Sequence, residues 1–193
     1  MRKLITIFLL FATLSVVADE RGEKRLELIS RHYSAIGAYS VSFVLQAGDG
    51  VERGVMQVDG NNSYLKVADT EVFVVDSLRY EVRASAKEII IDRADAYEKE
   101  LLNSLNGFSA IAADYAIEEC EVEGRVAVRL TPKQSGDTIY VITGTDGESV
   151  TKLQYGVGEN RVEVKVEQCK KNTQKLPIFN KEQYKGFEII DFR

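Results

Sequence analysis

Few side chains in this 193-residue chain could do chemistry, and their spacing builds no catalytic centre. His32 is the single histidine, and the sequence offers it no evident Ser or Cys partner to activate. Asp92 and Asp95 could act as paired carboxylates, but Asp95 also suits the N-cap of a helix, which is how we interpret it. The sequence contains no nucleophile elbow, phosphate-binding loop, zinc-ligand spacing or dinucleotide fingerprint. We therefore predict no enzyme, no metal and no cofactor.

The two cysteines, Cys120 and Cys169, could form a disulfide in an oxidising compartment. Strict strand alternation puts Cys120 on a face with Val122, and Cys169 on a face with Lys165, opposite the neighbouring valines. A bridge requires Cα atoms within about 7 Å of each other. A disulfide and two separate thiols both stay open, and neither suggests catalysis.

Residues 1–18 predict where the protein works. Arg2 and Lys3 precede an apolar run from Leu4 to Val17, and small residues end at Ala18 before a charged stretch. This order is typical of a cleavable secretory signal peptide, and the run is shorter than the roughly 20 residues of a membrane span. We expect cleavage after Ala18 and a soluble periplasmic protein formed by one domain over 19–193.

Charge argues against two classes of partner. The formal net charge is −5, and cleavage removes the positive charges of Arg2 and Lys3, which leaves −7. Such a surface repels the phosphate backbone of nucleic acids and anionic lipid headgroups. The mature chain of about 175 residues suffices for one domain with a hydrophobic core. We expect a monomer that binds no nucleic acid.

Hydrophobic periodicity predicts the elements that must position any site. Apolar residues recur every three or four positions over 21–36, which predicts a helix that ends near Gly37. From Tyr39 the period changes to two, and turn residues follow at hairpin spacing. The predicted strands are 39–46, 54–58, 64–68, 71–75, 79–83, 88–92, 117–123, 125–131, 138–144, 150–155, 161–168 and 187–192. A second helix is predicted from Asp95 to Asn106, so the fold is mainly β, an antiparallel meander interrupted by one helical insert.

Two predicted strands are apolar on both faces, at 72–75 and 89–91. An antiparallel strand with one solvated face alternates between apolar and polar residues, so both faces of these strands must be covered. One explanation is a closed core, made by a sandwich or by helices over one face and sheet curl over the other. The other is a curved sheet whose concave face lines an apolar cavity.

The C-terminal residues 179–193 favour the cavity. They run from Phe179 and Asn180 through a basic spacer, Tyr184 and Gly186 to an Ile-rich end closed by Asp191 and an arginine. Further features with similar order and spacing are the helix after the signal, Ser42-Phe43 with Gln46, Gly54, Asp76 and Leu102-Asn103. This pattern resembles periplasmic outer-membrane lipoprotein carriers of the LolA type over essentially the whole mature chain.

The resemblance implies both a fold and a function. The fold is an unclosed, strongly curved antiparallel sheet, a half-barrel, with helices covering the concave face. The function is to carry lipoproteins from an inner-membrane lipoprotein-release transporter to an outer-membrane acceptor, with their acyl chains in an apolar cavity. Acyl chains suit such a cavity because each buried CH₂ contributes about 0.8 kcal/mol.

The expected cavity combines strand residues with residues of the second helix above them. The strand candidates are Phe43, Met56, Leu65, Phe73, Tyr80 and Ile90. The candidates above them are Leu101, Leu102, Leu105 and Phe108. A one-residue slip of register would move a whole strand set to the other face.

Three positions depart from the carrier pattern. The turn from Asp76 to Tyr80 lacks the usual Gly and Trp, and Asn103-Ser104 replaces an Asn-Pro step. Lys66 stands where an Arg of the family would tie the lid, and a lysine offers no bidentate fork. The cargo therefore stays open between a lipoprotein and another lipid.

Two other functions remain as alternatives to the carrier. The same half-barrel could serve as a sensor or adaptor module that reports lipid or envelope stress. An envelope enzyme would require a polar constellation that the sequence does not contain.

Overall fold

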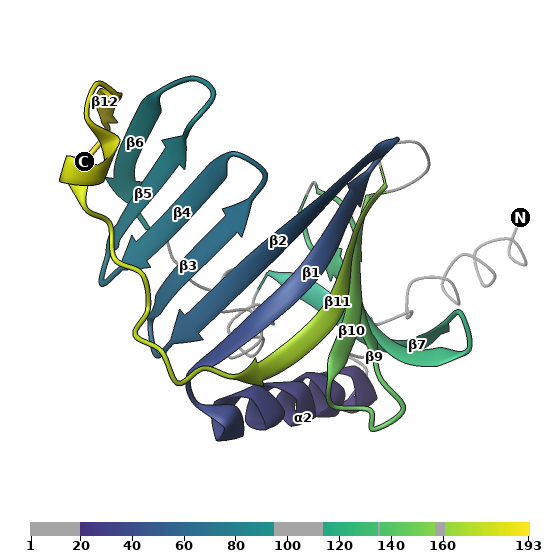
Figure 1. The fold of residues 1–193 in the computed structure, drawn as a ribbon. Helices are drawn as coiled ribbons and strands as arrows, with labels where there is room; N and C mark the ends of the chain where they lie inside the picture. Colours follow the sequence, from purple (N-terminus) through teal and green to yellow (C-terminus); the bar gives the residue numbers. More distant parts are fainter. Residues whose placement is uncertain (1–19, 95–113, 135, 157–160) are drawn as a thin grey trace, which may run out of the picture.

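The computed structural model describes residues 20–94, 114–134, 136–156 and 161–193 (Figure 1). These residues form one α-helix, twelve strands and a short 3₁₀ helix, η2, over Lys181–Tyr184. The α-helix is α2 (Glu20–Ile36), and the strands are β1 (Tyr39–Ala47), β2 (Gly50–Asp59), β3 (Asn62–Val67), β4 (Thr70–Val75), β5 (Leu78–Arg83), β6 (Glu88–Arg93), β7 (Tyr115–Val122), β8 (Arg125–Pro132), β9 (Ile139–Thr143), β10 (Val150–Tyr155), β11 (Val162–Lys171) and β12 (Glu188–Asp191). No helix within these ranges is long and apolar enough to cross a membrane.

The twelve strands form one unclosed sheet, as predicted, but their order is not a simple meander. The order is β12-β6-β5-β4-β3-β2-β1-β11-β10-β9-β8-β7. Hairpin neighbours pair within β1–β6 and within β7–β11, and β1 joins the two runs through β11. The meander prediction assumed that the insert after β6 returns to a neighbouring strand, whereas β6 and β7 lie near opposite edges. The last strand also differs, because β12 pairs parallel with β6.

Helix α2 packs against one face of the sheet, and the sheet curves around it (Figure 1). Its buried stripe, Leu26, Ile29 and Tyr33, belongs to a core cluster that includes Tyr39 of β1 and Ile117 of β7. In a flat sheet β1 and β7 would be five strand spacings apart, which is roughly 24 Å, whereas a helix with its side chains is only about 12 Å wide. One helix can contact both strands only if the sheet bends toward it. The face that contacts α2 is therefore the concave one, and we call it the inner face.

The predicted half-barrel is thus confirmed, with a helix on its concave side. The second predicted helix, from Asp95 to Asn106, lies outside the described residues.

Helix α2 packs tightly on the sheet at its start, since a Cβ atom at Gly22 would lie 2.9 Å from the backbone carbon of Glu118 on β7. Near its other end, the Tyr33 hydroxyl accepts a hydrogen bond from the Val150 amide at 3.0 Å.

The outer face of β2–β6 is covered by the end of the chain. Residues 172–193, which we call the C-terminal strap, run across this face before they add β12 to the edge (Figure 1). The strap contributes Leu176, Phe179, Tyr184 and Phe187 to a cluster with Tyr64, Phe73, Val82, Ile89 and Ile91.

The strap explains why strand β4 is apolar on both faces. Phe73 packs beneath Phe179 on the outer face, with ring centroids 6.0 Å apart, while Val72 and Val74 form a separate small cluster with Ala94. Neither a sandwich nor a cavity is needed to cover the outer side.

Candidate functional site

The candidate lipid-binding surface lies on the inner face of β1–β4. Register pairs Phe43 with Gly54, and Met56 with Leu65, which in turn pairs with Val72. Cross-strand partners point to the same face of a sheet, so these side chains share the concave side. We call Phe43, Met56, Leu65 and Val72 the inner apolar strip.

The inner apolar strip joins two hydrophobic clusters. Met56 packs against the cluster beneath α2, and Leu65 packs against the cluster of Val72 and Val74. Phe43 is only 8% exposed, and a Cβ atom at Gly54 would lie 2.3 Å from Cζ of its ring. Glycine at position 54 therefore leaves the room in which the Phe43 ring lies flat over β2.

The structure does not bring all six predicted strand residues together. Phe43, Met56, Leu65 and Ile90 point to the inner face, whereas Phe73 and Tyr80 pair with each other on the outer face. The two outer residues lie beneath the C-terminal strap and contact Phe179. Placing them in the cavity was wrong because alternation gives the parity within one strand, not the register between strands.

The remaining cavity candidates, Leu101, Leu102, Leu105 and Phe108, lie outside the described residues, and their role above the cavity stays a prediction.

Strand β5 ends the inner apolar strip with charged side chains. Glu81 lies between Val72 and Ile90 in register and is 8% exposed. Its carboxylate accepts a hydrogen bond from Arg83 Nε at 2.6 Å and another from Arg79. Burial raises the pKa of Glu81, but the two arginines outweigh this effect and hold the pKa below its usual value. The carboxylate is therefore charged at neutral pH and separates Ile90 from the strip.

Lys66 does not occupy a lid position over the concave side. It pairs in register with Val55 and Glu71, which puts its side chain on the outer face. Its Nζ lies 3.3 Å from the Glu71 carboxylate. The role of a lid tie is therefore wrong for Lys66, and charged inner-face contacts come instead from Arg79 and Arg83 on β5.

The two cysteines are free thiols on different strands and opposite faces. Cys120 pairs with Ala127 on the outer side of β7 and β8, and Cys169 packs against the inner-face cluster beneath α2. Burial raises the pKa of both thiols. Neither thiol is thus activated as a nucleophile.

The predicted face of Cys169 was wrong because β11 contains a bulge. The register between β1 and β11 shifts between Ser42 and Phe43, so that Gln168 faces the first and Val166 faces the second. The extra residue reverses the alternation, and Cys169 turns inward with the valines instead of outward with Lys165.

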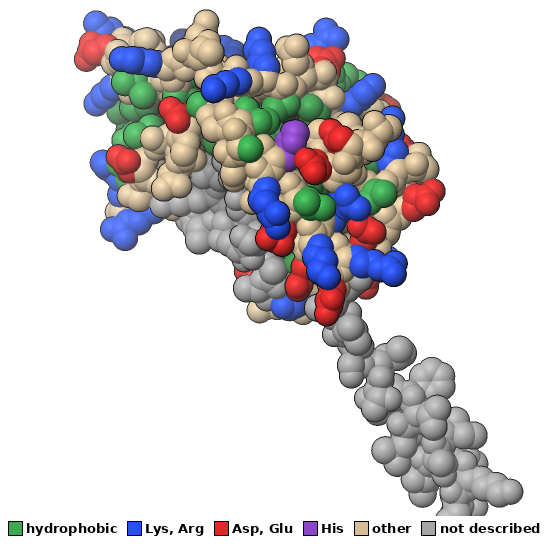
Figure 2. Space-filling view, turned by 90° about the horizontal axis from the view of Figure 1, so that it is seen from below, with side chains coloured by type: hydrophobic (Ala, Val, Ile, Leu, Met, Phe, Trp, Pro, Cys, Tyr) green, Lys and Arg blue, Asp and Glu red, His purple; other side chains and the backbone are tan. Residues whose placement is uncertain are grey.

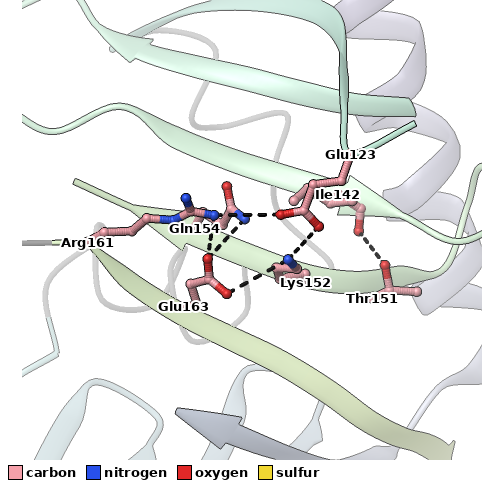
Figure 3. A network of polar contacts seen from close by, with 7 residues as sticks. All are labelled: Glu123, Ile142, Thr151, Lys152, Gln154, Arg161 and Glu163. Carbon is pink, nitrogen blue, oxygen red and sulfur yellow. Dashed lines mark hydrogen bonds and ion pairs between the residues drawn. The ribbon is translucent and has the colours of Figure 1, made fainter. Parts of the chain in front are cut away.

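A polar network that the sequence did not predict fixes the other half of the sheet (Figure 3). Lys152 of β10 lies 2.8 Å from Glu123, at the β7–β8 turn, and 3.8 Å from Glu163 of β11. Arg161 contacts both acids, and Gln154 donates to Glu163 at 3.3 Å. The two acids and the two basic residues neutralise one another, so the network stabilises the contact between these strands and leaves no net charge for a ligand.

Among the described residues, two pockets border α2, and neither is lined by the inner apolar strip. One, of about 220 Å³, contains Arg25, which pairs with Glu119 at 3.0 Å and donates to the Gly147 carbonyl at 3.1 Å. The other, of about 270 Å³, contains His32, whose Nδ1 lies 3.6 Å from the Glu148 carboxylate.

The surface over α2 mixes both signs of charge (Figure 2). Lys24 pairs with Glu20, and Arg31 pairs with Glu27, each one helical turn apart. Within the described ranges, no three His, Cys, Asp or Glu side chains gather as a metal site.

No protein-family model and no curated protein matches the chain. Among solved structures, an uncharacterized conserved protein from Thermus thermophilus matches at a TM-score of 0.56 and 7% identity, over 88% of this chain and 98% of that one. At this identity the likeness establishes a shared fold and nothing about activity.

Two further neighbours are more distant. A domain assigned to outer-membrane lipoprotein sorting, from Vibrio parahaemolyticus, matches at a TM-score of 0.40 and 9% identity over 85% of this chain and 97% of that one. A chain of the Pseudomonas aeruginosa MucA/MucB complex matches at 0.44 and 18% identity over 84% of this chain. This chain spans 61% of that one, less than two thirds of its length.

Proposed function

We propose that the protein binds the acyl chains of lipoproteins, or of a related lipid, on its inner face and carries them through the periplasm toward the outer membrane. The observation that supports this most directly is the inner apolar strip. Met56 and Leu65 are only half-buried although they lie at the centre of a concave sheet face. An acyl chain laid along them would remove their remaining apolar surface from water, which is favourable.

A paired measurement of binding and stability tests this proposal. Met56→Glu and Leu65→Glu place a charge in the strip, and Gln57→Glu places the same charge on the outer face of the same strand. A fluorescent fatty acyl probe should bind the parent and Gln57→Glu alike, and at least about tenfold more weakly to the two inner variants, since an unpaired charge opposes burial of a hydrocarbon chain. Thermal melting of all four proteins shows whether each variant is folded.

The outcomes separate a binding surface from an ordinary core. Loss of binding with a near-normal melt supports the carrier. No probe binding by the parent, together with collapse of the melt in both inner variants, contradicts it. A sensor or adaptor of the same fold would bind the probe but would not pass it to acceptor vesicles, so a transfer assay distinguishes that alternative.

Export completes the proposal. We propose that residues 1–18 direct secretion and are removed after Ala18, which leaves 19–193 as one periplasmic domain. N-terminal sequencing of the protein recovered from the cell envelope should begin at Asp19, and a mature chain that retains Met1 would contradict this.

A further inference from the structure

Strands β10 and β11 pair over only part of their length. Their register runs from Lys152 with Lys165 to Tyr155 with Val162 and then stops. Strand β11 continues along β1 as far as Lys171, while β10 shifts its register against β9 between Val150 and Lys152. The two strands therefore part at one end and open a gap in the middle of the sheet (Figure 1).

The gap is a pocket with helix α2 as its floor, and we call it the wedge. Its volume is about 270 Å³. The sides are formed by Ser149–Thr151 and by Val166–Cys169, and the floor by His32, Tyr33 and Ile36. Both sides coincide with a register shift, which is where a strand departs from regular pairing.

The two sides of the wedge differ in their backbone hydrogen bonds. On the β10 side, the Val150 amide already donates to the Tyr33 hydroxyl. On the β11 side, alternate residues after Lys165 direct N–H and C=O groups away from β1, because antiparallel strands bond alternately to each neighbour. No strand in the described part of the chain pairs with β11 there. Such an edge accepts an added strand.

Charge along β11 favours an acidic occupant. Lys165 and Lys170 are exposed on the outer face, and no ion pair joins either to an acid among the described residues. The acids near the wedge already have partners. Glu148 lies 3.6 Å from His32, Glu167 lies 3.5 Å from Arg53, and Asp146 accepts hydrogen bonds from the Glu148 and Ser149 amides and from the Ser149 hydroxyl. A strand that alternates acidic and apolar residues would direct its acids to the lysines and its apolar side chains to the floor.

We propose that the wedge binds an extended acidic segment of a partner protein, added as a strand to the free edge of β11. The segment pairs with the backbone of Val166–Cys169, its apolar side chains contact Tyr33 and Ile36, and its carboxylates face Lys165 and Lys170. None of the residues that line the wedge belongs to the inner apolar strip, and the proposal does not rest on acyl-chain binding.

Blocked pentapeptides test the two parts of the proposal. The peptide Glu-Val-Glu-Val-Glu can pair as a strand, whereas Glu-Pro-Glu-Pro-Glu has the same charge but lacks two backbone donors. The first should bind, and the second should bind at least about tenfold more weakly. Lys165→Glu with Lys170→Glu should weaken the first by about tenfold, since two attractions become repulsions. The control is the double variant Lys175→Glu with Lys181→Glu, which makes an equal change of charge on the strap. It should bind Glu-Val-Glu-Val-Glu with an affinity within about twofold of the parent.

Cys169 locates the bound peptide. In a Cys120→Ser background Cys169 is the remaining thiol, and it lines the wedge. Saturating Glu-Val-Glu-Val-Glu should slow its alkylation at least about fivefold, as expected for a thiol covered by a ligand. An unchanged alkylation rate, equal affinity for the proline peptide, or no binding at millimolar peptide would each overturn the proposal. Thermal melting is the control for folding in every variant, and failure of this proposal leaves the carrier function untouched.

Discussion

At the residue scale, Glu71 connects the sheet to the C-terminal strap. Its carboxylate accepts hydrogen bonds from the hydroxyls of Tyr64 at 2.6 Å and Tyr184 at 2.9 Å, and from Lys66 at 3.3 Å. Burial raises the pKa of Glu71, but these three donors and the charge of Lys66 outweigh it and lower the pKa overall. Conversely, burial and the hydrogen bond to Glu71 raise the pKa of Tyr184 to about 12. One acid thus holds β3, β4 and the strap together.

This lowered pKa predicts a pH-dependent stability. A carboxyl whose folded pKa lies below its ordinary value of 4.5 stabilises the fold above that pH and loses the effect as the pH falls through the folded value. Glu71→Gln should therefore lower the free energy of unfolding by about 1–2 kcal/mol at pH 7 and by much less at pH 3. Urea unfolding of both proteins across this range measures the difference. Glu182→Gln, at an exposed carboxyl, is the control and should change the free energy of unfolding little at either pH. A change on Glu71→Gln that is equal at pH 7 and pH 3 would contradict the assignment.

The sequence predicted which residues are apolar more reliably than it predicted the sheet face that each residue occupies. The sequence proposed Phe43, Met56 and Leu65 as cavity residues, and the register places all three on the inner face. It misplaced Phe73 because β4 is apolar at every position from Val72 to Val75, so alternation does not show which face Phe73 occupies. It misplaced Cys169 because a bulge is set by pairing with β1, which no local pattern contains.

At the element scale, the strap replaces the second layer that a sheet of this kind needs over its outer face. Phe179 stacks on Tyr80 with ring centroids 4.4 Å apart and on Tyr184 at 5.8 Å. The sequence predicted the strand at the end of the strap because its Ile-rich pattern is local. It did not predict the cover over β2–β6, because the strap aromatics are too widely spaced to show a period.

The stacked ring predicts how tightly the strap is held. Phe179→Ala removes the side chain between two tyrosines and should lower the free energy of unfolding by about 2 kcal/mol, from lost burial and lost ring contacts. Denaturant unfolding measures this. Ile178→Ala is the matched control, because the adjacent Ile178 is 70% exposed and its truncation should change stability by less than about 0.5 kcal/mol. Equal effects at the two positions would show that the strap is not packed as described.

At the scale of the whole molecule, α2 packs against both runs of strands, β1–β6 and β7–β11, and stabilises the curvature of the sheet. Leu26, Ile29 and Tyr33 contact strands from both runs, and Arg25 reaches Glu119 on β7 at 3.0 Å. Periodicity predicted this helix and its apolar stripe. The strand order lay beyond such reasoning, because the pairing of β1 with β11 depends on contacts between distant parts of the chain.

The tight contact between Gly22 and β7 predicts that a Gly→Ala substitution in α2 destabilises the protein instead of stabilising it. Gly→Ala inside a helix ordinarily stabilises by up to about 1 kcal/mol. At Gly22 the new methyl group would lie 2.9 Å from backbone of β7, which cannot move aside as a side chain could. Gly22→Ala should therefore destabilise by about 1–3 kcal/mol. Thermal melting measures the shift, with Ser34→Ala on the exposed side of α2 as the control. A stabilised Gly22→Ala protein would disprove this contact.

The position of β1 in the sheet also sets an order of events for folding. Strands β1–β6 are consecutive in the sequence and joined by short turns, so they can pair locally and early. The other edge of β1 pairs with β11, where Tyr39 meets Lys171 roughly 130 positions later in the chain. Until β11 arrives, the half-built sheet presents an open strand edge beside apolar side chains, the combination that promotes aggregation. The free edge of β1 therefore waits for its partner over a longer stretch of chain than the edge of β6, which pairs with β12, and a nascent chain would need protection at the β1 edge for longest.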